Sequence, residues 1–358
     1  MKSKSKKPVE TGERGLPQEG FMAGTRSQTM DALKGIAILI VMLGHVLSWN
    51  HMEDGYLYDA IKVIQMPLFI LVSGYLCGIG RPVRTWADYG RVLKRRALAY
   101  LVPFFFWILL QHPLAPVSNL VETLFALDKG LWFLMTLFLL QWMLYTAQLL
   151  GALAGRLKRP VFWLVYLGLA AFVVLETLLG WEFLSPGLTR LYLPFYLTGY
   201  LAGVHREQME KIPRTVKGGL FAIALAGFLF LVIARDLLDV GSPLLLGQQL
   251  AASFLGCYVV AYLTARWKNG KAKAFAAWLG GYTLEIYVLH FHFATVLNQG
   301  RTYELYTWQG MLFVLASFAV MSLITAGIIA VTKKVPLLNF LLYGKSGPRQ
   351  KRGAAVNK

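Results

Sequence analysis

Apolar residues recur along this chain in runs of roughly 16 to 24 residues, and short polar connections separate them. A helix needs about 20 mostly apolar residues to cross a hydrocarbon core about 30 Å thick. The pattern predicts an all-α, polytopic membrane helix bundle with about ten transmembrane helices. The expected spans lie near residues 32–49, 60–80, 97–113, 130–153, 161–180, 189–204, 219–236, 248–267, 274–297 and 311–331. The third and sixth are the shortest and contain Pro103 and Pro194.

The same pattern divides the chain into three parts. Residues 1–29 are polar and basic, so they bury too little apolar surface to fold and are expected to form a disordered cytoplasmic tail. Residues 30–335 form the transmembrane domain, and residues 336–358 are expected to form a second basic cytoplasmic tail. A signal peptide is not expected, because the first apolar run starts late and lacks a small-x-small cleavage site.

Composition and charge support a multi-pass protein of the cell membrane. Of the 358 residues, 56% are hydrophobic and only 15% are charged, whereas soluble domains have about 25% charged residues. The net charge of +18 is carried by short clusters between the apolar runs. Lysine and arginine mark cytoplasmic loops, so both termini are predicted to be cytoplasmic. Nucleic-acid binding is not expected, because no groove or single-strand motif accompanies the charge. The basic residues outside this pattern are Lys62, Lys129, Arg190, Arg235 and Arg301.

Small residues inside the spans predict packing. Cys77 and Cys257 each lie in an apolar run, where no disulfide, zinc knuckle or redox pair is expected. Glycine pairs spaced four apart allow helices to approach closely. These pairs are Gly74 with Gly78, Gly151 with Gly155, and Gly199 with Gly203. We find no repeat between the two halves of the chain, which argues against an inverted-repeat transporter.

The first span carries the most informative polar residues. Lys34 and His45 are eleven positions apart, which places them on one helical face about 16 Å apart along the axis. Asp31 lies three residues before Lys34, close to the same face. An ionisable group in a bilayer is costly and usually functional, and histidine can take and return a proton near neutral pH. The structural alternatives are a packing hydrogen bond for His45, a helix N-cap or dipole partner for Asp31, and an interfacial snorkelling position for Lys34.

The ninth span places a second histidine at a depth comparable to that of His45. His290 follows Tyr287 by three positions, and Glu285 lies deeper. Two histidines on different helices at similar depth predict a shared polar cavity. His292 is expected to be interfacial. The other histidines, His51, His112 and His205, lie at span ends or in loops.

Two further segments are candidates for ligand contacts. Ser73 and Gly74 in the second span permit a tight contact near its inner end. The basic cluster that includes Arg95 and Arg96 could hold a polyphosphate or anchor to anionic lipid headgroups, and charge alone favours the lipid. No spacing of histidine and acidic residues predicts a metal site.

Together these segments resemble the acyltransferase-3 family of integral membrane acyltransferases, in the branch of fucose 4-O-acetylases and related acetyltransferases. The resemblance covers roughly residues 28 to 335. It begins with a basic residue, ten residues and a histidine, here Lys34 and His45. It continues through Met66-Pro-Leu-Phe69, Ser73-Gly74-Tyr75, Leu131-Trp132-Phe-Leu134, Pro194-Phe-Tyr-Leu-Thr-Gly199-Tyr200 and Thr283-Leu-Glu-Ile-Tyr-Val-Leu-His290.

The resemblance implies O-acylation, with an acyl-coenzyme A such as acetyl-CoA as co-substrate and no permanently bound cofactor. The acceptor would be a hydroxyl of a glycan or a lipid-linked molecule. His45 resembles the family's essential histidine, and Lys34 the basic residue associated with the donor. Arg95 and Arg96 resemble the basic pair after the second span. Where the family often carries another arginine before the proline of the third span, this chain has Ala99 and Tyr100 before Pro103.

The candidate site follows from these assignments. His45, His290 and Tyr287 are the catalytic candidates, with His45 as general base or transient acyl carrier and the other two as oxyanion donors. Donor binding is assigned to Lys34, Arg95, Arg96 and Ser73, and a structural or cavity-lining role to Asp31, Gly74, Trp132 and Glu285. The alternatives are a transporter or flippase of a glycan or lipid and a non-catalytic membrane scaffold.

Overall fold

The computed structural model describes residues 27–111, 113–127, 131–234, 237–238 and 242–345, and the described chain is helical without strands. The predicted first tail, apart from residues 27–29, lies outside these ranges. The first half contains α1 (Gln28–Trp49), α2 (Tyr56–Ile79), α3 (Trp86–Gln111), α4 (Pro116–Phe125), α5 (Trp132–Leu153), a 3₁₀ turn (Gly155–Leu157), α6 (Lys158–Leu178) and α7 (Pro186–Val204). The second half contains α8 (Arg206–Lys211), α9 (Arg214–Ala234), α10 (Pro243–Arg266), α11 (Lys271–Leu279), α12 (Thr283–Leu289), η3 (His290–Phe293), α13 (Trp308–Thr332) and α14 (Pro336–Tyr343).

Seven helices within the described residues are long and apolar enough to cross a membrane, which establishes a multi-span architecture. They are α1, α2, α5, α6, α9, α10 and α13. The third and sixth predicted spans are also continuous helices, α3 and α7, but polar residues dilute their apolar character. The total of ten spans and the placement of both termini in the cytoplasm remain predictions.

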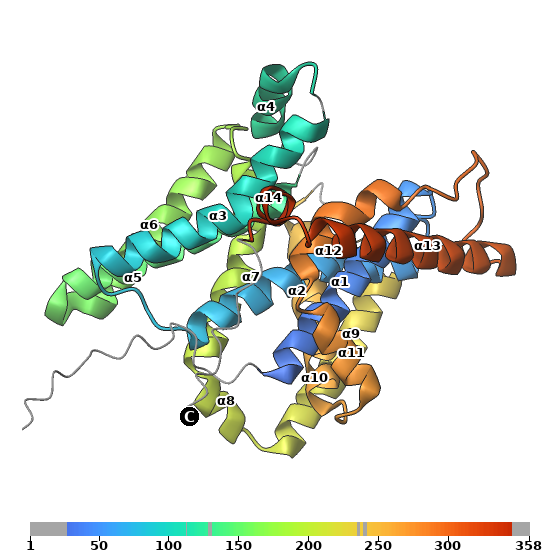
Figure 1. The fold of residues 1–358 in the computed structure, drawn as a ribbon. Coiled ribbons are helices and arrows are strands. Elements are labelled where there is room, and N and C mark those ends of the chain that lie inside the picture. The colour runs from blue at the N-terminus through green and yellow to red at the C-terminus, as the bar shows by residue number, and fades with distance from the viewer. Residues whose placement is uncertain (1–26, 112, 128–130, 235–236, 239–241, 346–358) are drawn as a thin grey trace, which may run out of the picture.

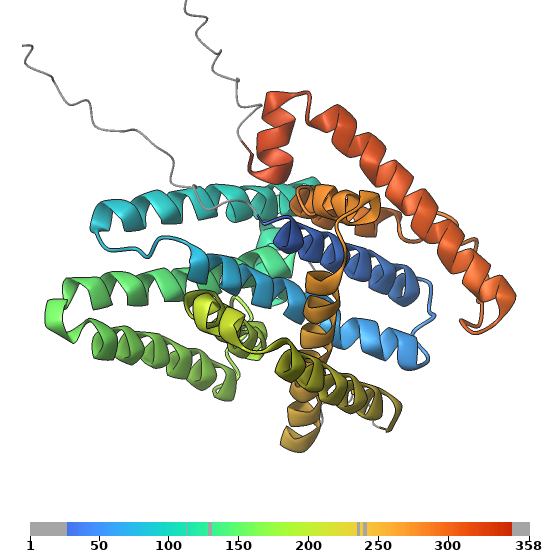
Figure 2. The same cartoon turned by 90° about the horizontal axis from the view of Figure 1, so that it is seen from below.

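The long helices form an antiparallel bundle around α2. Figure 2 shows α1, α2, α3, α5 and α6 running alongside one another, while α10 crosses their direction in this view. In Figure 1, α4 stands at the end of the bundle beyond α3, and α13 extends away from the centre. The two glycine pairs of α2 and α7 face each other: a Cβ added to Gly74 would collide with the carbonyl of Tyr196, and one added to Gly199 with that of Leu71. The predicted close packing is confirmed for these pairs.

The third glycine pair has two different roles. Gly151 packs against Lys158 and Phe162, so it brings α5 and α6 together as predicted. Gly155 has a positive φ of 58° and open space around it, so it serves the turn between the helices instead.

The prediction of one continuous ninth span over residues 274–297 is wrong. The chain forms α11, turns at Gly280 and Gly281, continues as α12 and tightens into η3. Gly280 packs directly on the backbone carbonyl of Asp31, and Gly35 packs on that of Ala276. The close crossing of α1 and α11 therefore requires glycine on both sides, and it redirects the chain before His290 is reached.

The second predicted tail also needs a correction. Its first residues form α14, an apolar helix that packs against α3 and α12. Trp107 of α3 donates from Nε1 to the carbonyl of Leu342 at 3.4 Å, and Gly344 ends the helix in a left-handed conformation against α3. A run of apolar residues after Pro336 therefore folds back onto the bundle. Residues 346–358 lie outside the described ranges.

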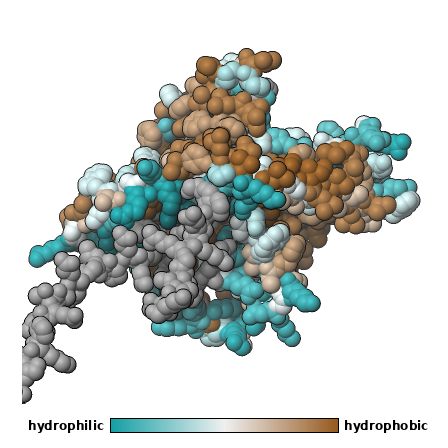
Figure 3. Space-filling view, in the orientation of Figure 1, coloured by the Kyte–Doolittle hydropathy of each residue, from teal (hydrophilic) through white to brown (hydrophobic). Residues whose placement is uncertain are grey.

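The surface shows where lipid is expected to contact the protein. Apolar side chains cover the region of α3 and α4 and the extended α13, whereas hydrophilic residues gather at the opposite edge (Figure 3). Large hydrophobic side chains such as Leu164 of α6, Ile223 of α9 and Leu323 of α13 are 70% or more exposed. In a membrane, these faces are the natural lipid-contacting surface.

Candidate active site

The two histidines of the first and ninth predicted spans meet in the bundle. His290 is fully buried, and its Nε2 lies 3.2 Å from Nδ1 of His45. Their rings are 4.9 Å apart at an interplanar angle of 81°, an edge-to-face arrangement. His45 extends from the continuous helix α1, and His290 begins the 3₁₀ turn that follows α12. The sequence prediction of similar depth thus corresponds to direct contact.

Neighbouring contacts hold this pair in register. The Asn50 amide donates to the carbonyl of Val46 at 2.7 Å and to that of Ala294 at 2.9 Å, which ties the end of α1 to the chain after η3. His292 stacks on Trp107 of α3 with ring centroids 5.0 Å apart. The position of His290 relative to His45 is therefore fixed from both sides.

The hydrogen bonds define the protonation pattern of the neutral pair. Nδ1 of His290 is 2.7 Å from the carbonyl of Ile286, which can only accept, so Nδ1 carries the proton and Nε2 presents a lone pair. Nδ1 of His45 lies 3.0 Å from the carbonyl of Val41 and faces that lone pair, so it is also the protonated nitrogen. The remaining nitrogen of His45, Nε2, is then unprotonated and able to accept a proton.

Aromatic and amide side chains surround the histidines. Tyr287 is buried, its ring lies 6.3 Å from that of His290, and Phe133 of α5 packs 5.2 Å from it. Phe291 lies 6.4 Å from His45. Gln65 of α2 packs against Gly44, and its buried Oε1 has no hydrogen-bond partner among the described residues. Sequence reasoning missed Gln65, although a glutamine within an apolar span is a polar exception that could have indicated it.

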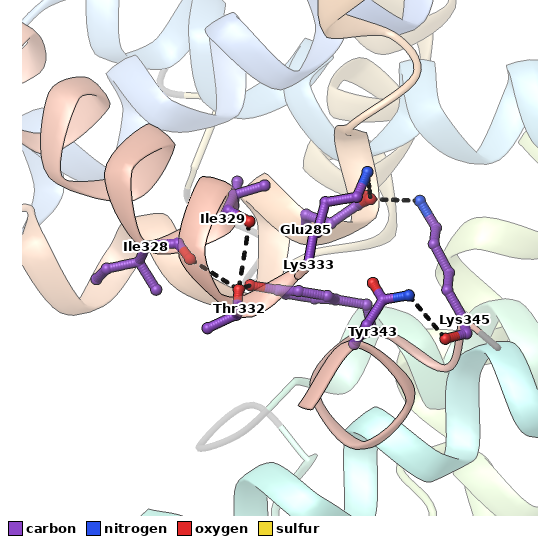
Figure 4. A network of polar contacts seen from close by, with 8 residues as sticks. Glu285, Ile328, Ile329, Thr332, Lys333, Tyr343 and Lys345 are labelled. Carbon is purple, nitrogen blue, oxygen red and sulfur yellow. Dashed lines mark hydrogen bonds and ion pairs between the residues drawn. The ribbon is translucent and has the colours of Figure 1, made fainter. Parts of the chain in front are cut away.

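Glu285 does not face the histidine pair but lies in an ion-pair cluster at the start of α12 (Figure 4). Its buried carboxylate accepts from Lys345 at 2.6 Å and from Lys333 at 3.3 Å, both through Oε1. Tyr343 shares a 2.7 Å hydrogen bond with Thr332, and burial raises the pKa of the Tyr343 hydroxyl. The cluster therefore joins α12 to α13 and α14. This contact was not predicted, because Lys345 was assigned to a tail.

At the other end of α1, the predicted polar stripe is present. Lys34 forms an ion pair with Asp31 at 2.7 Å, and the helix begins after Ser27. Asp31 is therefore not the N-cap; it lies in the first turn, where its charge also suits the helix dipole. Lys34 retains 22% side-chain exposure, so it is accessible from the end of the bundle where α1 begins.

The two arginines of the basic cluster point in different directions. Arg95 is exposed, whereas Arg96 turns into the bundle and donates to the hydroxyl of Tyr100 at 3.3 Å. Nε of Arg96 is buried and has no hydrogen-bond partner among the described residues. Tyr145 and Tyr196 line the same interior and meet at the thiol of Cys77, at 3.3 and 3.1 Å. Arg96 is thus an interior cation, whereas the sequence suggested a surface cluster.

The remaining candidates lie around this interior. Ser73 is half-buried on α2, and Gly74 provides the contact with α7. Trp132 stacks on Tyr192 of α7 at 5.2 Å. Within the described chain, no group of three or more His, Cys, Asp or Glu side chains could hold a metal ion.

Comparison with known proteins supplies the family. The model of the acyltransferase domain of the acyltransferase-3 family matches residues 28–331. The nodulation protein NolL of Sinorhizobium fredii is 27% identical over 308 residues, which cover 77% of this chain and 80% of that protein. NolL of Mesorhizobium japonicum is 28% identical over 196 residues, covering 50% of this chain and 49% of that protein. No solved structure matches.

The family match distinguishes among the three classes of protein considered from the sequence. It spans the helices that carry His45 and His290, and it selects the enzyme over the transporter and the scaffold. The chain therefore belongs to the acyltransferase-3 family, and it is a membrane acyltransferase.

Proposed function

We propose that this enzyme is an O-acyltransferase that moves an acetyl or other acyl group from acyl-coenzyme A to a hydroxyl of a glycan or lipid-linked acceptor. The observation that supports the proposal best is the histidine pair. Nδ1 of His45 is oriented by His290, and His290 is itself anchored to the carbonyl of Ile286. Enzymes that activate a hydroxyl group use a base oriented by a second residue in this way. The cell membrane is the proposed location.

In the proposed reaction, His45 is the general base. Its Nε2 takes the proton of the acceptor hydroxyl while the hydroxyl oxygen attacks the thioester carbonyl carbon. The carbon–sulfur bond then breaks, and the leaving thiolate takes the proton from His45 to give free coenzyme A. The acyl group remains on the acceptor oxygen as an ester.

His290 and Tyr287 have supporting roles in this scheme. During proton transfer His45 becomes an imidazolium. Its Nδ1–H then donates a hydrogen bond to the lone pair of His290 Nε2, 3.2 Å away. A hydrogen bond to a charged group contributes about 1.5–3 kcal/mol, which is about 10- to 100-fold in rate. Tyr287 is a candidate donor to the developing oxyanion.

The test uses membranes that contain the full chain and the glycans of the expressing cells. Radiolabelled acetyl-CoA is added, and both transfer of label to the glycan fraction and release of free thiol are measured. Replacing His45 with Ala or Gln should reduce both by about 10²- to 10⁴-fold, the usual contribution of a general base. The matched control is His51→Asn, since His51 is exposed at the end of α1 and has a positive φ that Asn tolerates.

Three results would contradict the proposal. Full transfer by His45→Ala with normal membrane insertion would remove His45 from the chemistry. Label retained on the protein itself, in wild type but not in His45→Ala, would show that His45 carries the acyl group as an acyl-histidine and does not act only as a base. Release of thiol without any labelled glycan would exclude glycans as acceptors.

A further inference from the structure

A cavity of about 570 Å³ opens at the end of the bundle where α2 ends and α6 begins. Its walls come from the loop after α2, the last turns of α5, the start of α6 and the end of α7. This volume falls within the range of about 300–1,000 Å³ that is typical of small-molecule sites. The cavity is separate from the histidine pair, and sequence reasoning assigned no role to it.

The polar wall of the cavity is cationic. Arg84, Lys158 and Arg159 line it together with His205, and among the described residues no aspartate or glutamate lines it. The helix α6 starts at Lys158 without a side-chain cap, so its positive dipole end adds to the potential. Three cations, one from the loop after α2 and two from the first turn of α6, without a neutralising acid favour a ligand that carries more than one negative charge.

The remaining wall of the cavity is aromatic, and hydrogen bonds hold part of it in place. Phe162 and Trp163 of α6 line the cavity, and Tyr200 of α7 lies beside them with its ring 6.0 Å from that of Phe162. The Gln148 amide holds Tyr200 in place, because it donates to its hydroxyl at 3.4 Å and accepts from the backbone N–H of Val83 at 3.0 Å. A cationic edge beside flat aromatic side chains suits a molecule that combines phosphates with a planar ring.

The position of the cavity fits a donor that reaches inward. Gln148 lies fifteen residues after Phe133 on α5, which is roughly 22 Å along the helix axis. Phe133 packs on Tyr287 beside the histidine pair. Cys77 belongs to the cavity wall and also to the interior cluster with Tyr145 and Tyr196. The positive-inside rule places this basic end in the cytoplasm, where nucleotide-linked acyl donors are made.

We propose that this cavity binds the phosphorylated adenosine end of the acyl-coenzyme A donor, with Arg84, Lys158 and Arg159 on the phosphates and the aromatic wall against the adenine. The inference rests on the proposed function. It assigns the nucleotide end to these residues and leaves the long pantetheine arm to bridge the distance to the histidine pair. Under this assignment Arg96, whose guanidinium points inward, is not needed to bind the donor phosphates.

The test measures binding to the purified full chain in uncharged detergent by isothermal titration calorimetry. Two probes are used: coenzyme A, and adenosine 3′,5′-bisphosphate, which keeps the nucleotide end and lacks the arm. Both Arg84→Gln and the double variant Lys158→Gln with Arg159→Gln should weaken both probes by about 10-fold or more, since each removes charge-assisted hydrogen bonds. All three side chains are exposed, so their loss should leave the fold intact.

Matched controls come from the same loops. Arg81 and Arg156 carry the same charge as Arg84 and Arg159 but do not line the cavity. Arg81→Gln and Arg156→Gln should therefore bind both probes within about 2-fold of wild type. Equal weakening by the control and cavity variants would overturn the proposal, because it would show a general surface potential in place of a site.

Further measurements separate this inference from the proposed function and from a lipid site. If acetyl-CoA supports transfer but the cavity variants bind both probes normally, the cavity assignment is wrong and the enzymatic proposal stands. If wild type neither binds coenzyme A nor transfers acetyl, the proposed donor fails as well. The last measurement repeats the titration in nanodiscs with phosphatidylglycerol. One outcome would identify a lipid headgroup site and overturn the proposal. In that outcome, adenosine 3′,5′-bisphosphate binds wild type only when phosphatidylglycerol is absent, and Arg84→Gln no longer retains the lipid.

Discussion

The central and the outer helices of this bundle differ in how much of their surface other helices cover and in the residues they carry. In the apolar window of α2, 67% of the residues are buried within the protein, whereas in that of α6 only 11% are. The central helices carry paired glycines and buried polar side chains such as Gln65 and Gln141. The outer helices α6, α9 and α13 present large apolar side chains to their surroundings.

The difference follows from the free energy that helix packing can gain inside a lipid bilayer. Burying an apolar side chain against another helix brings little energy when the alternative is contact with lipid tails. The inner helices must therefore gain their stability from close backbone approach and from hydrogen bonds, and these demand particular residues. The outer helices only need to be apolar and long enough. Chemistry accordingly concentrates at the centre, and substitutions there should have the larger effects.

The largest expected effect within the centre, apart from loss of His45, is on catalysis. His290→Gln removes the nitrogen that faces Nδ1 of His45, so the imidazolium loses one of its two acceptors and keeps only the carbonyl of Val41. We expect kcat for acetyl transfer to fall about 10- to 100-fold with KM for acetyl-CoA nearly unchanged. Steady-state thiol release measures both constants.

The neighbouring histidine provides the control. His292 lies two residues later and stacks on Trp107, with no direct role in the pair. His292→Gln should therefore keep kcat within about threefold of wild type, as a packing change would. Equal losses in both variants would show that η3 is merely disturbed and that His290 has no special part.

The next effect concerns stability. Gly74→Ala places a Cβ against the carbonyl of Tyr196 at the crossing of α2 and α7. We expect a loss of about 1–3 kcal/mol in the free energy of unfolding, because the two backbones must move apart. Gly168→Ala on α6 meets open space and should be neutral or stabilising by up to about 1 kcal/mol, since alanine favours the helix. Unfolding of the purified variants in SDS, followed by circular dichroism, compares the two.

How much of this could be predicted depends on the range of the interactions. The positions of seven spans and the alignment of Lys34 with His45 follow from hydropathy and helix geometry, which are local properties. The sequence predicted that His45 and His290 lie at comparable depth and share a polar cavity; the structure brings the two side chains into direct contact, which comparable depth alone does not specify. These inferences need only the order of residues along each helix.

The missed features depend on contacts between distant segments. The break at Gly280 exists because that glycine packs on α1, and hydropathy alone merges α11 and α12 into one span. The apolar segment after Pro336 was too short to count as a span, although α3 offers it a surface. The basic cavity draws its walls from three connections, so its residues looked like separate topology signals. In each case the tertiary structure supplies the information.

A smaller effect is expected at the edge of the centre. Lys345→Gln removes the shorter of the two ion pairs to Glu285 and leaves that buried carboxylate with Lys333 alone. Lys345 is 38% exposed, so solvent screens part of the interaction, and we expect a loss of about 1 kcal/mol in the free energy of unfolding. Hydrogen exchange in α12 and α14 should rise in this variant. Lys334→Gln removes the same charge one residue after Lys333 and should leave exchange unchanged; a rise there too would indicate a general charge effect.

The smallest effect is expected at the periphery, and its size tests whether that face is passive. Leu323 of α13 is 72% exposed, and lipid is expected to cover its side chain. Because its side chain exchanges lipid contact for lipid contact on folding, Leu323→Ala should change the free energy of unfolding by less than about 0.5 kcal/mol and leave acetyl transfer intact. The SDS titration and thiol release used above measure both. A loss of 2 kcal/mol or more would resemble the cost of a buried leucine. It would mean that another protein surface, such as a second copy of the chain, covers α13, and the division between centre and periphery would then have to be redrawn for the assembly.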